Sequence, residues 1–548
     1  MPVRQSTKYS KTENSDVIIV GAGIAGLVCA YEALNKGLSV RVIERHAQKD
    51  LGGLAKSAFG GMALVDTPLQ RRMGIKDCPE LALGDWCSFA DFSEQDVWPR
   101  KWAEAYVNDS AEKVYHWLKE KDLRFFPAVN WVERGQYSRG NSVPRYHVLW
   151  GTGYRLVERF VELLRQHANA QKLQFLFQYR CDQLIKKAGR IVGCYVENEQ
   201  SKENREKQEF YADNIIVATG GINGSLEKVR KNWHQPWGKP PTEILNGSHP
   251  FADGHMHDSV QSHGGAVTHL DNMWNYAAGI PHPKPEFEHH GLSLIPCKSA
   301  LWLDHHGKRI GPEPLVTGFD TNELCRRVSQ LDKPYTWQVL NWRIAAKELS
   351  VSGSEHNPYI RDRKTLPFLK EVLLGNHRLV RQLEKESDHF LVADSIDKLV
   401  TKMNRLNKNS SVNLELLHQS IREYDDVILR GKSQWNDDQL RKVMHARNWR
   451  SDKFRTCFPK PISDKTSGPF IAIKLRLISR KSLGGIQTDL SSRVLDLSGE
   501  VIPGLYAIGE ASGFGGGGAN GFKSLEGTFL SGCILTARAA ANSISPLN

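Results

Sequence analysis

Three glycines and an acid near the start of the chain have the spacing of a dinucleotide-binding site. Gly21, Gly23 and Gly26 follow the pattern G-x-G-x-x-G, and Glu44 comes later in the same stretch. In this pattern the first glycine permits a tight turn, the second lets a pyrophosphate approach the backbone, and the third lets helix and strand pack closely. The carboxylate of Glu44 can accept hydrogen bonds from both hydroxyls of a ribose. These residues predict that the chain binds a dinucleotide.

The segments around these residues are the ones that such a site requires. "DVIIV" (16–20) is a short β-branched run, typical of a buried parallel strand. The residues after Gly23 have helical spacing, so the first N–H groups of that helix would face the phosphates. A second strand, "LSVRVIE" (38–44), ends in Glu44. The same site is predicted to include three neighbours, Ile24, Ala25 and Arg45.

Two later strands indicate which dinucleotide binds. "EFYADNIIVATGG" (209–221) ends in an Ala-Thr-Gly-Gly turn, and "GEVIPGLYAIGEASG" (499–513) ends in a Gly-Glu pair. In this architecture such strands return to the first sheet, and an acid after the last one can bond the ribityl chain of a flavin. A second intact G-x-G-x-x-G is absent, so a separate NAD(P)H domain is not expected. The residues assigned to the flavin from these strands are Ala218, Thr219, Gly220, Gly509 and Glu510.

Composition limits the other functions. With 548 residues, of which 40% are apolar, the chain can bury large cores and should form more than one domain. The chain contains no run of 18 apolar residues, so a transmembrane helix is not expected. The first 15 residues are polar and lack the apolar stretch of a secretory signal. Nine cysteines are scattered without CxxC spacing, which fits reduced thiols, and we expect a cytoplasmic protein.

The net charge of +12 is spread along the chain among acidic residues. This distribution is typical of a generally basic surface and differs from a concentrated patch for a polyanion. We therefore expect no nucleic-acid partner. The rival interpretation is a non-catalytic FAD-bound protein whose basic surface docks a polyanion such as nucleic acid or a membrane.

Taken together, these motifs resemble the fumarate reductase/succinate dehydrogenase flavoprotein superfamily, and within it the 3-ketosteroid Δ1-dehydrogenase-like proteins. The resemblance is carried by "DVIIVGAGIAGL", Glu44, "LGGLAKSAFGGM" (51–62), "IIVATGG" (215–221) and the segments from 484 to 532. It covers both ends of the chain well and the middle weakly. It implies FAD as the cofactor, with further contacts from Gly52, Gly53, Ser57, Gly60, Gly61, Ser524 and Leu525.

The resemblance also implies an α/β fold in which a discontinuous Rossmann-type FAD-binding domain carries an inserted α+β cap domain. Residues 1–14 are predicted to be a disordered lead-in. Residues 15–275 and 465–548 would form the FAD-binding domain, and residues 276–464 the cap or substrate domain. The active site should then lie at the junction of the two domains.

Neither a covalent bond to the flavin nor a metal site is expected. Some relatives tether FAD through a histidine shortly before a Gly-Gly pair, and here Leu54 stands in the matching place, so the resemblance implies noncovalent FAD. The histidine doublets at 289–290 and 305–306 lack companion cysteines or carboxylates at ligand spacing. We therefore predict no metal site.

Residues of a dicarboxylate site are mostly missing. Arg309 and Glu313 occupy their places in a "GKR" segment, but no arginine stands where a proton donor would fall. The arginine of the family's "HGANR" motif is replaced by Gly521, and Lys481 stands where a substrate-binding histidine is found. The missing arginines and histidine are the groups that would bind the two carboxylates of the substrate and protonate it, so fumarate-type reduction is not expected.

Oxidation of a CH–CH bond beside a ketone requires less charge. The carbonyl must be polarised, a base must take the α-proton and the flavin must take the β-hydride. The family uses tyrosines for this purpose, and the candidates here are Tyr276, Tyr146, His147, Lys481 and Lys523. Phe522 stands where ketosteroid dehydrogenases carry a tyrosine, which puts a steroid 3-ketone bound in the usual manner in question and makes Lys523 an alternative donor.

The sequence thus predicts an FAD-dependent dehydrogenase that acts on a flat alicyclic, steroid-like ketone. Because an NAD domain, a haem motif and CxxC are absent, the electrons would go to an external acceptor such as a quinone or a redox protein. An enone or enoate reductase that runs the reaction in the opposite direction remains the alternative enzyme.

Overall fold

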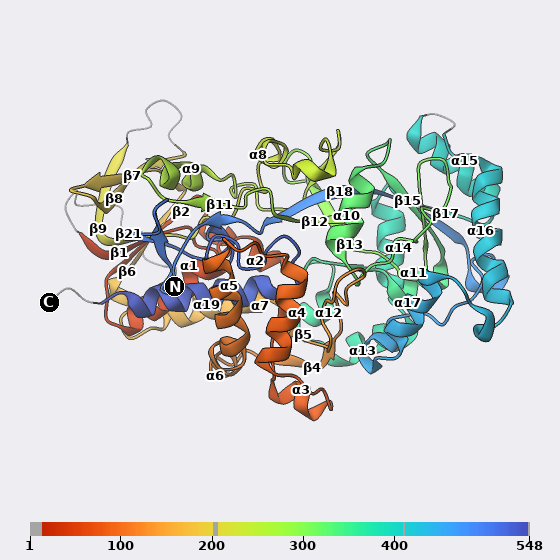
Figure 1. Cartoon of the computed structure of the whole chain (residues 1–548), viewed down its shortest axis with the longest axis horizontal. Coiled ribbons are helices and arrows are strands. Elements are labelled where there is room, and N and C mark those ends of the chain that lie inside the picture. The colour runs from red at the N-terminus through yellow and green to blue at the C-terminus, as the bar shows by residue number, and fades with distance from the viewer. Residues whose placement is uncertain (1–13, 201–206, 409–410, 546–548) are drawn as a thin grey trace.

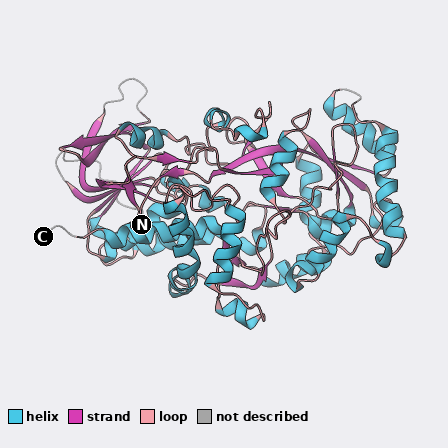
Figure 2. Cartoon of the chain, viewed as in Figure 1, coloured by secondary structure: helices cyan, strands magenta, loops and turns pink. Residues whose placement is uncertain are grey.

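The structure, a computed structural model, describes residues 14–200, 207–408 and 411–545; most of the predicted lead-in, 1–13, lies outside them. Figure 1 shows two lobes side by side, one that holds both ends of the chain and one built from its middle. Helices and strands are mixed in both lobes (Figure 2).

The first lobe is built on a largely parallel sheet. Its strand order is β20-β21-β9-β1-β2-β6, and β2, β1, β9 and β21 all run in the same direction, with bounds β1 Ser15–Val20, β2 Val40–Glu44, β6 Leu173–Phe177, β9 Gln208–Val217, β20 Arg493–Leu495 and β21 Val501–Ala507. The antiparallel hairpin of β7 (Tyr179–Lys187) and β8 (Arg190–Asn198) extends from β9. Both the early and the late strands of the chain therefore return to one sheet, as the sequence predicted.

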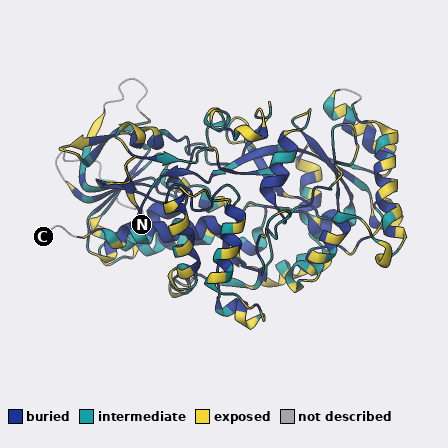
Figure 3. Ribbon diagram, in the orientation of Figure 1, coloured by how far each residue is buried: buried dark blue, intermediate teal, exposed yellow. Residues whose placement is uncertain are grey.

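The two faces of this sheet pack against different helices. Val17 and Ile19 of β1 belong to a core with α1 (Ile24–Asn35), α7 (Thr152–Arg165) and α19 (Thr528–Ser543). Ile18 and Val20 point to the other face, where α9 (His255–Ser262) packs. Because successive side chains of a strand point to opposite faces, the unbroken apolar run of β1 reflects burial on both sides. β1 is almost entirely buried, whereas β7 and β9 include exposed residues, and the strands of the first lobe accordingly range from dark blue to yellow in Figure 3.

The second lobe has its own sheet, in the order β14-β15-β18-β12-β13-β16, with β10 and β17 also paired to β18. The central strand β18 is 13 residues long. The bounds of these strands are β10 Leu245–Asn246, β12 Met273–Pro281, β13 Gly291–Ile295, β14 Leu301–Leu303, β15 Thr336–Asn341, β16 Ser350–Val351, β17 Phe390–Ala393 and β18 Phe470–Ser482. The helices of this part are α8 Leu226–Lys231, α10 Thr321–Ser329, α11 Trp342–Glu348, α12 Pro358–Arg361, α13 Thr365–Leu374, α14 His377–Glu386, α15 Ile396–Asn407, α16 Leu414–Leu429, α17 Asp438–Arg447 and α18 Arg450–Lys453.

The strands β12 and β18 connect the lobes. The predicted boundary at 275–276 falls inside β12, and the one at 464–465 falls shortly before β18. β12 pairs with β18 across the second sheet, and β18 then leads back toward the first lobe. The domain boundaries themselves stay a prediction.

A smaller unit lies beneath the first lobe. The strands β3, β5 and β4 form an antiparallel sheet in the order β3-β5-β4. The bounds here are β3 Gly61–Ala63, β4 Phe125–Asn130, β5 Tyr146–Leu149, α2 Leu54–Ser57, α3 Pro68–Arg72, α4 Pro79–Ala90, α5 Val97–Asp109, a π-helical segment Ser110–His116 and α6 Trp117–Glu120. A pair of short strands, β11 (Val267–Thr268) and β19 (Gly485–Ile486), completes the fold.

Candidate active site

A cavity of about 810 Å³ runs from the first lobe into the second. At one end it is lined by residues at or just beyond the ends of strands of the first sheet, including Gly23, Glu44 and Thr219. At the other end it is lined by side chains of the second lobe, such as Leu294 and Phe368. In open parallel sheets ligands bind beyond the carboxyl ends of the strands, and this cavity has that position.

The start of α1 fits a dinucleotide pyrophosphate. A Cβ added at Gly23 would meet no atom within 4 Å, so open space lies above this backbone. No side chain caps the helix and no acid stands in its first turn, which leaves the positive end of the helix dipole available to an anion. Gly52 forms an isolated β-bridge with Gly23, and the two segments line the same part of the cavity.

The other two glycines of the motif serve packing. A Cβ at Gly26 would lie 2.1 Å from the carbonyl oxygen of Gly21, so only glycine permits this approach of helix and strand. Gly21 has a φ of +103°, a backbone conformation that side-chain-bearing residues rarely adopt. The surroundings of Gly21 and Gly26 thus match the turn and packing roles of the motif, and the approach of a pyrophosphate to Gly23 stays a prediction.

Glu44 is held at the end of β2 by backbone donors. Its Oε2 accepts from the N–H of Ala22 at 2.7 Å, and its Oε1 accepts from the N–H of His46 at 2.8 Å. Carboxylate oxygens accept more than one hydrogen bond, so both can still receive ribose hydroxyls. Neighbouring Arg45 is instead held by Glu199 and Asp253, with N–O distances of 2.9 and 2.8 Å.

The structure brings most of the predicted cofactor residues to the cavity. Its lining includes Gly21, Gly23, Ile24, Ala25, Glu44, Arg45, Gly52, Gly53, Gly60, Gly61, Ala218, Thr219, Gly220 and Glu510. The predicted residues outside the lining are Gly26, Ser57, Gly509, Ser524 and Leu525. Ser524 lies before the last helix, since α19 starts at Thr528, and the Ser524 hydroxyl donates to Oδ1 of Asn520 at 3.1 Å.

Three of the five predicted catalytic residues, Tyr146, Tyr276 and Lys481, line the cavity. His147 does not line the cavity, because its side chain points to the buried face of the small sheet. Its Nδ1 lies 2.7 Å from the carbonyl of Arg145 and its Nε2 lies 2.8 Å from the hydroxyl of Thr67. Burial lowers the pKa of His147 to about 4. With both ring nitrogens engaged, His147 serves the framework behind Tyr146.

Lys523 and Phe522 also lie away from the cavity lining. The ammonium of Lys523 donates to Asp320 at 3.0 Å, and the Asp320 side chain caps the start of α10. The ring of Phe522 packs on His234, with centroids 4.2 Å apart. Lys523 is therefore not placed to donate a hydrogen bond to the carbonyl of a ligand in the cavity.

Glu526 is the residue of this site that was not predicted. Its Oε2 accepts hydrogen bonds from the hydroxyl of Tyr276 at 2.8 Å and from Nε1 of Trp274 at 3.0 Å. Glu526 lines the cavity, and its charge adds to the effect of burial in raising the pKa of both Tyr276 and Tyr146. Glu526 lies within the segments 484–532 that carry the family resemblance, but its partners are about 250 residues away in sequence.

Tyr146 is wedged between two glycines. A Cβ at Gly61 would overlap the Tyr146 hydroxyl at 1.9 Å, and a Cβ at Gly527 would lie 2.9 Å from its ring. Within the described part of the chain, the Tyr146 hydroxyl has no hydrogen-bond partner. A fixed ring with an uncommitted hydroxyl on a cavity can donate to a ligand.

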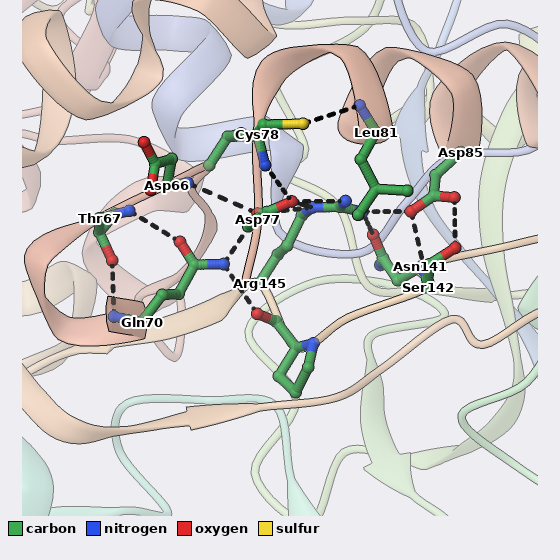
Figure 4. A network of polar contacts seen from close by, with 12 residues as sticks. Asp66, Thr67, Gln70, Asp77, Cys78, Leu81, Asp85, Asn141, Ser142 and Arg145 are labelled. Carbon is green, nitrogen blue, oxygen red and sulfur yellow. Dashed lines mark hydrogen bonds and ion pairs between the residues drawn. The ribbon is translucent and has the colours of Figure 1, made fainter. Parts of the chain in front are cut away.

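A buried ion network fixes the chain just before Tyr146 (Figure 4). The guanidinium of Arg145 donates to Asp77 at 2.8 Å and to Asp85 at 2.6 Å, and all three side chains are buried. The amide of Gln70 donates to the carbonyl of Pro144 at 2.9 Å. These contacts hold the start of β5, and with it the position of Tyr146.

Charged groups gather where the two lobes meet. Burial lowers the pKa of Lys481, and the positive charge of nearby Arg480 lowers it further, so the Lys481 ammonium loses its proton more easily. Burial raises the pKa of Glu510, whose carboxylate accepts from the N–H of Ser482 at 2.9 Å. Perturbed titratable groups on one cavity are typical of functional sites.

The run of four glycines, 515–518, forms a buried loop after β21. Its residues are not part of the cavity lining. A Cβ at Gly515 would meet Trp102 at 2.5 Å, and one at Gly517 would meet the Thr268 hydroxyl at 2.3 Å. All four glycines have positive φ, so this buried loop needs glycine for its conformation and its packing.

One cluster has the composition of a metal site. The ligand atoms of His282, Glu355 and His356 all lie within 4.8 Å of one another. However, Nδ1 of His282 accepts the N–H of Lys284 at 3.1 Å, so a neutral ring carries its proton on Nε2 and donates to Glu355 at 3.2 Å. A metal ion bound at Nε2 of His282 would have to displace this proton and its contact with Glu355.

Comparisons with known proteins identify the chain as a flavoprotein, as the dinucleotide-type end of the cavity suggests. The chain matches the protein family described as FAD binding domain over residues 16–530. It is 41% identical to a KsdD-like steroid dehydrogenase of Mycobacterium tuberculosis over 96% of this chain and 95% of that protein. Among solved structures, it resembles 3-ketosteroid Δ1-dehydrogenase of Sterolibacterium denitrificans with a TM-score of 0.70, 16% identity and coverage of 97% and 99%.

A flavocytochrome c3 fumarate reductase also has this fold, with a TM-score of 0.68, 18% identity and coverage of 97% of this chain and 78% of that one. Likeness at this identity shows the fold and leaves the reaction open. In the described residues, no helix is long and apolar enough to span a membrane. The chain therefore belongs to the FAD binding domain family, and it is an FAD-dependent oxidoreductase of the class that acts on CH–CH bonds.

Proposed function

We propose that the protein removes two hydrogens from adjacent carbons beside the ketone of a flat, steroid-like substrate. The observation that supports this most is the meeting of Tyr146, Tyr276 and Glu526 on one cavity, between the dinucleotide cradle and an apolar region. The side chains of that region include Phe126, Leu294, Ile295, Trp302, Phe368 and Leu369. An apolar slot with a few polar groups suits a lipophilic ketone.

The residues divide the proton chemistry between them. The uncommitted hydroxyl of Tyr146 donates to the ketone oxygen and so makes the neighbouring α-C–H more acidic. As that C–H bond breaks, its proton passes to the oxygen of Tyr276, whose own proton moves to Oε2 of Glu526 along the 2.8 Å hydrogen bond. When bound, FAD supplies the acceptor for the hydride from the β-carbon.

Three further parts of the proposal concern the cofactor and its electrons. FAD is held noncovalently, since Leu54 lines the cavity and cannot form a bond to the flavin. The second lobe acts as a cap over the flavin. The electrons pass to an external quinone or redox protein. All nine cysteines are free, which suits the cytoplasmic location that we also propose.

Anaerobic flavin spectroscopy tests the reaction and its direction. We expect a saturated 3-ketosteroid to bleach the oxidised flavin, and a quinone, but not NAD⁺, to restore its colour. If only the photoreduced enzyme reacts, and does so with an enone, the protein is a reductase. If neither ligand changes the spectrum, both versions are wrong. Acid precipitation should release the flavin into the supernatant, and retention in the pellet would contradict noncovalent binding.

A further inference from the structure

The helix α13 is apolar but has no buried residue. Its sequence, TLPFLKEVLL, holds six Leu, Phe and Val side chains, all of them partly or fully exposed. Leu366 is 80% exposed and Leu374 is 67% exposed. Contiguous exposed apolar residues of this kind mark an interaction site more often than single exposed leucines do.

The same helix forms a wall of the cavity. Phe368, Leu369, Val372 and Leu373 line it, and Leu369 and Leu373 are also exposed to solvent. Phe454, which follows α18, is a further exposed ring of the cavity lining. The apolar surface outside the protein is thus continuous with the apolar interior of the cavity along α13.

Uncompensated positive charge surrounds this apolar surface. Arg363, Lys364 and Lys370 are exposed, and none has an ion pair within the described residues. The acidic neighbours are compensated: Glu371 pairs with Arg378 at 3.0 Å, and Asp362 pairs with Arg361 at 2.7 Å. The surface therefore presents leucines inside a basic border, on a chain of net charge +12.

We propose that α13 and its basic border dock the protein on an anionic lipid bilayer, with the leucines inserted among the headgroups. Apolar side chains flanked by lysine and arginine are the chemistry that binds such surfaces. A second copy of the chain is the poorer occupant, because two like-charged borders would repel each other. Docking would place the cavity wall against the bilayer, where a lipophilic ligand can enter without crossing water. This proposal goes beyond the dehydrogenation and does not depend on it.

Sedimentation of the FAD-loaded protein with lipid vesicles tests the proposal. We expect binding to vesicles of phosphatidylcholine mixed with phosphatidylglycerol, weaker binding to phosphatidylcholine alone, and loss of the difference at high salt. L366S/L374S should lower the partition coefficient about tenfold or more. K364E/K370E should lower it by a similar factor on the anionic vesicles alone. None of these four residues lines the cavity, so turnover in detergent-free buffer should be unchanged.

Matched variants at distant sites serve as controls. L429S/L497S removes two leucines that are 70% and 89% exposed elsewhere, and K231E/K239E reverses two exposed lysines at and after α8, on the opposite side of the molecule from α13 in Figure 1. Both should bind like the unmodified protein. The proposal is overturned if no vesicle is bound, if the control variants lose binding equally, or if α13 variants bind normally. A dimer that L366S/L374S dissociates would assign the surface to a second copy instead.

Discussion

The hydroxyl of Tyr276 donates a 2.8 Å hydrogen bond to Oε2 of Glu526, which ties β12 to the loop that precedes α19. Nε1 of Trp274 reaches the same oxygen at 3.0 Å. Because β12 belongs to the second sheet and α19 packs on the first, this carboxylate is oriented only when both lobes are folded together.

Tyr276 and Glu526 are expected to act as one unit. Tyr276→Phe and Glu526→Gln should each lower kcat about 10²- to 10³-fold, since proton transfer contributes on this scale. The double variant should lose little more than either single one, because both interrupt the same transfer. Tyr154→Phe, on an exposed ring of α7, should leave kcat unchanged. Additive losses would show that the two residues act separately, and bound FAD should be normal in all variants.

Two glycines of one motif should fail in different ways. Gly23→Ala adds a Cβ into open space at a φ of −66°, so the apoprotein should stay within about 1 kcal/mol of its original stability. The same methyl group obstructs the phosphates, and FAD affinity should fall at least about tenfold. Gly26→Ala meets the carbonyl of Gly21 at 2.1 Å and should cost about 1–3 kcal/mol or more in the apoprotein.

Flavin titration and urea unfolding of the apoproteins separate these two effects. The assignment of Gly23 to the phosphates is wrong if Gly23→Ala binds FAD normally. Equal destabilisation by both substitutions would contradict the different surroundings of the two glycines.

His147 should make stability depend on pH. Its pKa is about 4 in the folded protein because of burial, and about 6.5 in an unfolded chain. As the pH falls from 6.5 toward 4, the unfolded state takes up the proton first, so folding free energy is lost. At pH 5 this loss amounts to about 2 kcal/mol relative to pH 7.

Replacement of His147 by Gln should remove this part of the pH dependence. The difference between the free energies of unfolding at pH 7 and pH 5 should be smaller by about 2 kcal/mol in His147→Gln. His289→Gln, on an exposed ring, is the control and should keep the full difference. A pH dependence unchanged by His147→Gln would mean that the buried ring does not titrate as stated.

The Arg145 network predicts unequal effects of two arginines that share one partner. Arg145→Ala leaves Asp77 and Asp85 buried without their cation and should cost about 3–5 kcal/mol. Arg139 also reaches Asp85, at 2.7 Å, but it is exposed, so Arg139→Ala should cost less than about 1 kcal/mol. Urea unfolding measures both. Similar losses for the two variants would show that burial does not set the strength of these pairs.

The cofactor half of the site could be predicted from sequence because its contacts are local. Gly21, Gly23 and Gly26 lie in one strand–turn–helix segment, and Glu44 ends the next strand, so their order along the chain already sets their arrangement in space. The return of the later strands to the same sheet followed from their apolar runs and terminal turns. The later glycine-rich segment was harder to interpret, because Ser524 and Leu525, predicted to contact FAD, lie outside the cavity lining.

The catalytic half depended on tertiary structure. Glu526 meets Tyr276 across 250 residues, and no local pattern distinguishes a carboxylate that will receive a buried tyrosine. Tyr146 and His147 are adjacent in sequence, but alternation along β5 turns one side chain to the cavity and the other to the core. The sequence by itself determined the FAD-binding framework through local backbone geometry. Only the folded chain decided which polar groups face the cavity, because that depends on how the two lobes pack.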